Sequence, residues 1–226
     1  MGRESRYAEP AAGTMNAKSH WDAIYATKRA DEVSWFQREA AASLALIRRA
    51  APAPTASVID VGGGASVLVD GLLHAGYHEI TVLDVSAAAL DVARARLGPA
   101  AGGVTWLDAD VLDAALPHAA FDVWHDRAVF HFLTEAADRA RYVEHVRHAL
   151  KPGGHVVIAT FADDGPTKCS GLPVVRYTPS ALQAAFGGQF LLVESLREAH
   201  VTPSGTTQAF VYCLFRFGTP PGRTSP

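Results

Sequence analysis

The sequence predicts an α/β fold in which helices cover both faces of a mixed, mostly parallel sheet. Three observations lead to this prediction. Short apolar runs alternate with helical patterns, as in sheets built from strand–helix–strand units. The first of these runs enters a glycine turn that opens the next helix. Near the end of the chain, a turn at 202–205 joins two longer apolar runs, 190–196 and 207–217, which predict a closing antiparallel pair.

Length and composition limit the classes of protein that fit this sequence. The chain has 226 residues, of which 49% are hydrophobic, enough for one domain with a sizeable core. Its net charge is -3 and no dense basic run occurs, which argues against a nucleic-acid partner. No apolar run reaches the roughly 18 residues of a membrane span, and the start lacks the apolar core of a signal peptide. Two cysteines form no disulfide framework, so we expect a cytoplasmic protein whose oligomeric state is open.

Four segments are expected along the chain. Residues 1–14 are polar and predicted to be disordered, and Met15 is an alternative start. Residues 15–50 carry aromatic side chains in helical patterns and are predicted to form a helical lid. A proline-rich breaker opens the main domain, residues 51–217, and the Pro/Gly-rich residues 218–226 are predicted to be a disordered tail.

The first strand and its glycine turn organise the main domain. Residues 58–61 form an apolar run that holds Asp60. Three glycines follow this run: Gly62, Gly63 and Gly64. Glycine permits positive φ and leaves no side chain between the backbone and a ligand, and the helix start beyond it offers free amides. The second strand ends in Asp84, where a carboxylate is well placed to bind a ribose diol.

Two details of this unit decide which adenosine cofactor fits. A dinucleotide site has a third glycine where this chain has Val67. Asp60 lies inside the strand, two residues before the first glycine. A carboxylate at that point suits a positive centre or an amino group better than it suits a pyrophosphate.

The pattern of Asp60, the glycines and Asp84 resembles motif I of the class I S-adenosylmethionine-dependent methyltransferases, and the resemblance covers residues 21–217. It implies a Rossmann-like seven-stranded mixed sheet with helices on both faces and a C-terminal antiparallel hairpin. It also implies S-adenosylmethionine as the cofactor, bound by Asp60, by the glycine loop and by Asp84 with its neighbour Val85. Residues 51–217 are then the methyltransferase domain.

The third strand, residues 104–107, leads to two further acidic residues. In the family pattern, a carboxylate here accepts the adenine amino group, and the next backbone amide reaches a ring nitrogen. Asp110 with Val111 fits this role best. Asp108 is the alternative, and its structural role would be to cap the turn.

Aromatic side chains of the N-terminal segment are candidates for contacts with the methyl acceptor. Trp21 and Tyr25 lie four residues apart, on one face of a helix. That face either packs on the domain or lies over the cofactor and the acceptor, as N-terminal extensions do in methyltransferases of this type. Trp35 and Phe36 follow in a loop, and an exposed aromatic pair there favours a lid. A further helix is expected at 43–49.

Capping signals delimit the helices that follow the second and fourth strands. Ser86 is a candidate N-cap, and Gly98 ends the helix that it starts. Thr134 is the corresponding candidate for a later helix, which the Lys-Pro-Gly-Gly turn at 151–154 ends. This turn, followed by an apolar strand at 156–160, also resembles the methyltransferase family.

Three titratable residues follow the fourth strand, residues 121–124. In a doubly wound sheet the carboxyl end of this strand lies beside the first strand, where ligands bind. His125 or Asp126 is therefore a candidate general base, because an imidazole titrates near neutral pH and a carboxylate can hold it. His125 is also a candidate cofactor contact, and Arg127 is a candidate acceptor contact. Structural pairing of these side chains is the alternative, and at most two of the three are expected to face the cleft.

Residues 161–177 form a loop-rich insertion after the fifth strand. It follows the carboxyl end of that strand, where loops commonly carry acceptor specificity. Arg176 and Tyr177 are candidate acceptor contacts, and pairing of Arg176 with Asp163 or Asp164 is the alternative.

No metal site or reactive thiol is predicted. The ten histidines show no spacing typical of metal ligands. Cys169 has no adjacent base that would activate its thiol.

The sequence as a whole favours methyl transfer from S-adenosylmethionine to a nucleophilic acceptor. A short chain with one small insertion suits a small-molecule acceptor. The Trp-Asp-x-x-Tyr start at 21–25 with the later Trp-Phe also resembles some protein-lysine N-methyltransferases, so a protein acceptor is an alternative. A non-catalytic S-adenosylmethionine-binding module is another. A nicotinamide-dependent reductase is disfavoured by Val67 and the closing hairpin, and an aminopropyl transferase by the absence of an acidic set for a polyamine.

Overall fold

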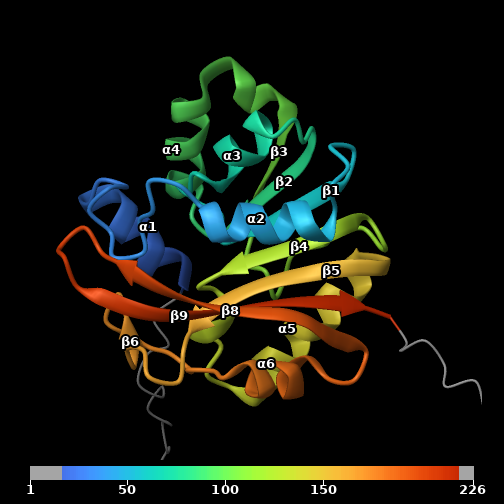
Figure 1. Cartoon of the computed structure of the whole chain (residues 1–226). Helices are drawn as coiled ribbons and strands as arrows, with labels where there is room; N and C mark the ends of the chain where they lie inside the picture. The colour runs from blue at the N-terminus through green and yellow to red at the C-terminus, as the bar shows by residue number, and fades with distance from the viewer. Residues whose placement is uncertain (1–16, 219–226) are drawn as a thin grey trace, which may run out of the picture.

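One seven-stranded sheet with helices on both faces forms the body of the molecule (Figure 1). The computed structural model describes residues 17–218. Across the sheet the strands follow the order β3-β2-β1-β4-β5-β9-β8, which is the mixed sheet that the sequence predicts. Most of the two segments predicted to be disordered, 1–14 and 218–226, and the alternative start at Met15 lie outside the described residues.

Five parallel strands carry the glycine loop. They are β1 (Ser57–Val61), β2 (Glu79–Asp84), β3 (Val104–Asp108), β4 (Phe121–Arg127) and β5 (Leu150–Phe161). β1 pairs with β2 on one side and with β4 on the other. The order of the strands therefore reverses at β1, and ligands of such sheets bind beyond the carboxyl ends at this point. All five predicted runs are confirmed, and β4 and β5 extend further than the sequence indicates.

Two antiparallel strands close the sheet. β9 (Thr207–Phe217) pairs antiparallel with β5 and with β8 (Phe190–Val201), which confirms the predicted hairpin. A separate two-stranded ribbon lies in the loop-rich insertion and consists of β6 (Lys168–Cys169) and β7 (Leu172–Pro173). Strands of two residues carry no periodic pattern, so the sequence did not indicate this ribbon.

Helices cover the sheet in two groups (Figure 1). One face packs against α2 (Ala41–Ala50), α3 (Leu68–His74) and α4 (Ala87–Leu97), and the other packs against α5 (Ala136–Ala149) and α6 (Pro179–Phe186). Neighbouring residues of a strand divide between the two cores, because side chains alternate across a sheet. Val123 belongs to the core under α2, for example, and Trp124 to the core under α5. None of the helices in residues 17–218 is long and apolar enough to cross a membrane.

The N-terminal segment divides into two helices with different surroundings. α1 (Ala17–Thr27) carries Trp21 and Tyr25 beside the strand ends and contacts α4. α2 instead buries Leu46 and Ile47 against the sheet. The lid predicted for residues 15–50 therefore stays a prediction for α1 and the loop after it, whereas α2 is part of the layered domain.

Three of the four predicted helix boundaries agree with the structure, among them the end of α5 at Ala149, just before residues 151–154. The Ser86 hydroxyl accepts a hydrogen bond from the Ala89 amide at 3.3 Å, and Gly98 ends α4 with a φ of 57°. The prediction that Thr134 is the N-cap of α5 was wrong. Glu135 holds that position, one residue later, and no described side chain caps the helix by a hydrogen bond. The Thr134 amide is instead hydrogen-bonded to the Phe132 carbonyl of the preceding turn, η2 (Phe130–Phe132).

Candidate active site

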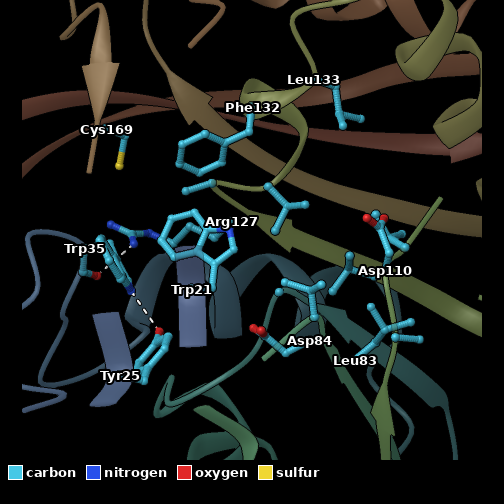
Figure 2. A pocket seen from close by; sticks show the side chains of 17 residues that line it. Trp21, Tyr25, Trp35, Leu83, Asp84, Asp110, Arg127, Phe132, Leu133 and Cys169 are labelled. Carbon is cyan, nitrogen blue, oxygen red and sulfur yellow. Dashed lines mark hydrogen bonds between the residues drawn. The ribbon is translucent and has the colours of Figure 1, made fainter. Parts of the chain in front are cut away.

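A cleft lies at the carboxyl ends of the parallel strands (Figure 2). Its larger part is lined by the ends of β1 to β4, by Phe132 at the end of η2 and by Cys169 of β6. Its smaller part is lined by the glycine loop, by Ser43 of α2 and by the segment after α1. The residues that line both parts are Tyr25, Trp35, Gly62 and Arg127. The two parts therefore adjoin at these four residues.

The glycine loop has a backbone that other residues would strain. Gly62 and Gly64 have φ angles of 66° and 39°, in the left-handed region. A Cβ atom at Gly63 would lie 2.6 Å from Oδ2 of Asp60, and one at Gly62 would lie 2.0 Å from Val129. The loop is thus close-packed against its own strand and against the end of β4, which explains why three successive glycines occur here.

Asp60 belongs to a buried chain of hydrogen bonds that runs through His125 to Ser43. Oδ1 of Asp60 lies 2.7 Å from Nδ1 of His125, and Nε2 of His125 lies 2.8 Å from the Ser43 hydroxyl. All three side chains are buried. Oδ2 of Asp60 is also buried but has no hydrogen-bond partner, and it lies under Gly63. One carboxylate oxygen is therefore held in place while the other is left for a ligand.

The same contacts argue against His125 as a general base. Both of its ring nitrogens are occupied by Asp60 and Ser43, and only 3% of the residue is exposed. Neither nitrogen is available to take a proton from an acceptor. The structure thus places His125 behind the cofactor side of the cleft, where it orients Asp60.

Asp126 does not face the cleft at all. Its carboxylate accepts hydrogen bonds from the amides of Val129 and Phe130, at 2.9 and 3.0 Å, and from the Tyr142 hydroxyl at 2.5 Å. It is fully buried, and this burial raises its pKa to about 6. These contacts correct its assignment as a base, because the carboxylate holds the η2 turn against α5 and has no surface on the cleft.

Asp84 lies at the end of β2 and lines the larger part of the cleft. Its Oδ1 accepts a hydrogen bond from the Ser86 amide at 2.8 Å. Burial, reinforced by the negative charges of Asp60, Asp108 and Asp22, raises its pKa to about 7. Without a ligand, this carboxyl group therefore titrates in the neutral range.

Asp110, rather than Asp108, borders the cleft. Asp110 and Val111 line its larger part, and Oδ1 of Asp110 accepts a hydrogen bond from the Leu112 amide at 2.9 Å. Asp108 is directed to Lys18 of α1, with 3.1 Å between the carboxylate and Nζ. The geometry therefore favours Asp110 with Val111 over Asp108 for the adenine contact, which stays a prediction.

Aromatic side chains form one wall of the cleft (Figure 2). The rings of Trp21 and Trp35 meet edge to face with their centroids 5.5 Å apart, and Trp21 meets Phe132 in the same way at 5.2 Å. Nε1 of Trp35 lies 3.4 Å from the Tyr25 hydroxyl, the donor–acceptor contact that Figure 2 draws. Phe36 lines the smaller part of the cleft. The four aromatic residues predicted from the N-terminal segment thus all reach the cleft, and Phe132 joins them from η2.

Arg127 follows His125 and Asp126 in β4 and borders both parts of the cleft. Its Nε donates to the Tyr212 hydroxyl at 2.9 Å, and its Nη1 donates to the Trp35 carbonyl at 3.1 Å. The guanidinium also lies over the ring of Phe210, 4.3 Å from the centroid. The structure thus brings Arg127 to the aromatic wall, and its role as an acceptor contact stays a prediction.

Arg176 and Tyr177 lie away from the cleft, contrary to their assignment as acceptor contacts. Arg176 is exposed and donates to the Gly165 carbonyl at 3.1 Å. Tyr177 is buried against Phe130 on the α5 face, with ring centroids 5.6 Å apart. The alternative pairing of Arg176 is also wrong, because Asp163 and Asp164 pair with Arg197 of β8.

The sequence did not indicate that Ser43 and Cys169 lie at the cleft. Ser43 reaches the cleft from α2 and hydrogen-bonds His125, a contact between residues 82 positions apart. Cys169 lines the acceptor side from β6, and burial raises the pKa of its thiol to about 11. Within residues 17–218, no group of three His, Cys, Asp or Glu side chains is arranged to hold a metal ion.

Comparison with known proteins supports a methyltransferase. Residues 59–156 match the family model described as Methyltransferase domain. An uncharacterized methyltransferase of Mycobacterium tuberculosis is 32% identical over 121 residues, which cover 52% of this chain and 56% of that protein. A protein of Mycobacterium bovis, also an uncharacterized methyltransferase, matches to the same extent. The chain thus spans about half the length of the curated relatives that it matches.

Solved structures share the fold over most of the chain. A structure concerned with the conversion of a disulfide bond into a thioacetal group during echinomycin biosynthesis has a TM-score of 0.72 at 20% identity, over 90% of this chain and 93% of that one. The 1,6-didemethyltoxoflavin-N1-methyltransferase of Burkholderia thailandensis has a TM-score of 0.68 at 20% identity, over 95% and 94%. That structure holds 1,6-didemethyltoxoflavin and S-adenosylhomocysteine together.

The sheet order, the glycine loop and these similarities define a protein of the class I methyltransferase fold. Residues 59–156, less than half of the chain, match the methyltransferase family model, and the fold is similar to that of S-adenosylmethionine-dependent methyltransferases. The residues present fit the cofactor of this family. Within residues 17–218, Oδ2 of Asp60 is buried without a partner and suits an ammonium group, and the glycine loop that lines the cleft has no room for a side chain at Gly62 or Gly63.

Proposed function

We propose that this protein transfers the methyl group of S-adenosylmethionine to a small-molecule acceptor bound against Trp21, Trp35 and Phe132. The observation that carries this proposal is the aromatic wall at the ends of β1 and β4, next to the glycine loop. In sheets of this topology the ligand-binding crevice lies at this position.

In this proposal, residues at the ends of the first three strands and the glycine loop hold the cofactor. Asp60 binds the ammonium group, the glycine-loop backbone borders the methionine portion, and Asp84 with Val85 binds the ribose. Asp110 and the amide of Val111 bind the adenine. When bound, the cofactor supplies an electrophilic methyl group on a sulfonium, so the protein has only to hold an unprotonated acceptor in line with it.

Positioning is then the main contribution of the chain to the rate. His125 and Asp126, the two candidate bases, are both fully engaged in internal hydrogen bonds. Orientation of two reactants can by itself lower a barrier by about 7–11 kcal/mol. The aromatic wall therefore orients the acceptor and excludes water, and the acceptor binds in its nucleophilic form.

Contacts of residues 34–37, the segment between α1 and α2 beside the cleft, favour a small acceptor over a protein. His200 of β8 lies 2.7 Å from the Ser34 carbonyl, and Gln37 donates to Glu198 of the same strand at 3.2 Å. Arg127 holds the Trp35 carbonyl between these two contacts. The segment is thus attached to the sheet along its length and narrows the approach to the cleft. The Burkholderia thailandensis enzyme, which has the same fold, accommodates 1,6-didemethyltoxoflavin beside S-adenosylhomocysteine.

The test begins with cofactor binding measured by calorimetry. We expect S-adenosylmethionine and S-adenosylhomocysteine to bind, and we expect no useful binding of NAD. Tritium transfer from labelled S-adenosylmethionine into a cell extract fractionated by size then identifies the acceptor class. Label in small molecules supports the proposal, and label confined to protein supports the protein-lysine alternative. Cofactor binding without any transfer would leave the non-catalytic binding module.

A further inference from the structure

The Arg127 side chain is a buried cation at the acceptor end of the cleft. Only 10% of the side chain is exposed, and the residue borders both parts of the cleft. In Figure 2 the guanidinium lies between Trp35 and Trp21, on the same side as Cys169. It is therefore close to any molecule that occupies the aromatic wall.

The hydrogen bonds of this guanidinium are incomplete. Nε and Nη1 donate to Tyr212 and to the Trp35 carbonyl. Nη2 is buried and has no hydrogen-bond partner in the part of the chain that the structure describes. An unmet donor on a buried charged group costs more than one on a neutral group.

The charge of Arg127 is also only partly balanced. Among residues 17–218, the carboxylate that reaches it belongs to Glu198, whose Oε2 lies 3.8 Å from Nη2, beyond hydrogen-bond distance. That carboxylate already accepts hydrogen bonds from Tyr212 at 2.9 Å and from Gln37 at 3.2 Å. Asp126 points to the opposite face of the sheet, toward Tyr142.

The other titratable groups that face Arg127 carry no compensating charge. Burial raises the pKa of the Cys169 thiol to about 11, so it is not a thiolate at neutral pH. Burial lowers the pKa of His131 to about 3 and also lowers that of His200, so both imidazoles are neutral. The acidic residues of the cleft, Asp60, Asp84 and Asp110, lie on its proposed cofactor side. The cleft is thus negative where a sulfonium cofactor binds and positive where the acceptor binds.

We propose that the methyl acceptor is a planar molecule that carries a carboxylate or another anionic oxygen group, and that Arg127 binds this group. The aromatic wall accommodates the planar body, and the guanidinium balances the negative charge. A cationic acceptor such as a lysine side chain is disfavoured, because it would lie against a buried positive charge. This inference rests on the proposed function, since it concerns the acceptor of the same cleft.

The carboxylate of the cofactor's methionine portion offers the same chemistry and must be distinguished from an acceptor carboxylate. We assign Arg127 to the acceptor because it borders the aromatic wall, with Trp21, Phe132 and Cys169 around it. The experiment therefore measures cofactor binding and acceptor binding separately.

The test uses three probes of one shape and different charge: benzoate, benzamide and benzylamine. Each is titrated into the full-length protein saturated with S-adenosylhomocysteine, and binding is followed by ligand-observed NMR. We expect benzoate to bind roughly tenfold or more tightly than benzylamine, as one charge-assisted contact implies. Equal affinity of the three probes, or no binding of any of them, would overturn the inference.

Arg127→Gln provides the second arm, with Arg147→Gln as the matched control. Arg147 pairs with Glu144 on the outer face of α5, so its loss leaves the cleft untouched. We expect Arg127→Gln to abolish the preference for benzoate while S-adenosylhomocysteine affinity stays within about threefold, a change of under 1 kcal/mol. A large loss of S-adenosylhomocysteine affinity in Arg127→Gln, absent from the control, would instead assign Arg127 to the cofactor carboxylate.

Failure of the inference and failure of the proposed function give different results. If the unaltered protein does not bind S-adenosylhomocysteine, the proposed function itself is wrong. If it binds S-adenosylhomocysteine but shows no preference among the probes, only the anionic acceptor is wrong. The comparison of probes in the unaltered protein does not depend on whether Arg127→Gln folds.

Discussion

Asp60 is the residue whose surroundings most constrain the chemistry of the cleft. Nδ1 of His125 lies 2.7 Å from Oδ1 of Asp60 and Nε2 lies 2.8 Å from the Ser43 hydroxyl, so both ring nitrogens are engaged. Oδ2 of Asp60 is the one side-chain oxygen of the three that has no hydrogen bond. The chain of hydrogen bonds therefore fixes the carboxylate so that this oxygen lies under the glycine loop.

We predict that His125→Ala weakens cofactor binding rather than removing a base. Loss of the imidazole leaves Asp60 buried with no hydrogen bond to Oδ1, which costs about 1–3 kcal/mol. Calorimetry should show S-adenosylmethionine affinity reduced by roughly tenfold to a hundredfold, since each tenfold is about 1.4 kcal/mol. Ser43→Ala, which removes only the outer hydrogen bond, should have a smaller effect in the same direction.

The rate at saturating cofactor distinguishes this role from acid–base chemistry. A general base contributes about 10²–10⁴ to the rate. Should His125→Ala bind the cofactor normally and yet lose turnover on that scale, the positioning role would be refuted.

The order of His125, Asp126 and Arg127 explains why their roles were difficult to assign from the sequence. All three lie in β4, so their side chains alternate between the two faces of the sheet. His125 points to α2 and Ser43, and Asp126 points to α5 and Tyr142. The sequence places all three residues at the cleft, but the direction of each side chain depends on where β4 ends, three residues later than the apolar run indicates.

At the scale of elements, the η2 turn depends on Asp126. The turn leads the chain from β4 to α5 and brings Phe132 to the cleft. Asp126 accepts the amides of Val129 and Phe130 at its start, and the Tyr142 hydroxyl ties the same carboxylate to α5. One buried side chain therefore connects a strand, a turn and a helix.

We predict that Asp126→Asn destabilises the fold and acts on turnover mainly through that loss. The amide nitrogen of asparagine cannot accept the backbone amide that one carboxylate oxygen now accepts, which leaves a buried donor unmet at a cost of about 1–3 kcal/mol. Urea unfolding should report this loss as a lower midpoint. Tyr142→Phe is the comparison variant: it removes the third hydrogen bond of Asp126, together with the one that the hydroxyl accepts from Trp124 Nε1 at 2.9 Å, and keeps both backbone contacts. Unchanged unfolding with strongly reduced turnover would show that Asp126 acts in the chemistry after all.

Element boundaries were predictable where local chemistry sets them. The apolar runs of the strands, the Ser86 cap and the Gly98 terminus were confirmed because each depends on residues close in sequence. The β6–β7 ribbon was missed because its two-residue strands are set by their surroundings. α2 was assigned to the lid because the sequence does not reveal that Leu46 and Ile47 meet the sheet.

At the scale of the whole molecule, the sheet topology, the strand-end positions of the proposed cofactor residues, and the acceptor-side positions of Trp21 and Arg127 were predictable from the sequence, whereas the position of Cys169 was not. The glycine loop, Asp84 and Asp110 lie at strand ends, which the parallel topology brings together at one edge. The acceptor side joins Trp21, Arg127 and Cys169, from α1, β4 and β6. Arg176 and Tyr177 were placed there because they follow β5, but the β6–β7 ribbon carries the chain past the cleft first.

The buried carboxyl of Asp84, proposed to bind the cofactor, lowers the stability of the unliganded fold as pH rises. Its pKa is raised from 3.8 to about 7 by burial and by neighbouring carboxylates. A carboxyl whose folded-state pKa is raised contributes stability that is fully present below its unfolded pKa and lost as pH rises through its folded pKa. The unliganded fold therefore loses stability from this group between about pH 4 and pH 7, where the ionised form becomes available to bind a ribose.

We predict that Asp84→Asn is more stable than the unaltered protein without ligand and binds the cofactor less well. The stability difference should grow from about pH 4 to about pH 7 and then level off, because only the carboxyl titrates. His131, whose pKa is lowered to about 3, produces an opposite trend, but it is present in both proteins and cancels in the difference. Urea unfolding across this range measures the difference, and calorimetry measures S-adenosylhomocysteine affinity.

At about pH 8 the affinity of Asp84→Asn for S-adenosylhomocysteine should be lower by roughly tenfold or more, since a charge-assisted hydrogen bond is lost. At about pH 6, where much of Asp84 is protonated in the unliganded protein, the two affinities should converge. A stability difference that does not change with pH would show that Asp84 is ionised throughout, and equal affinities at about pH 8 would remove it from the cofactor site.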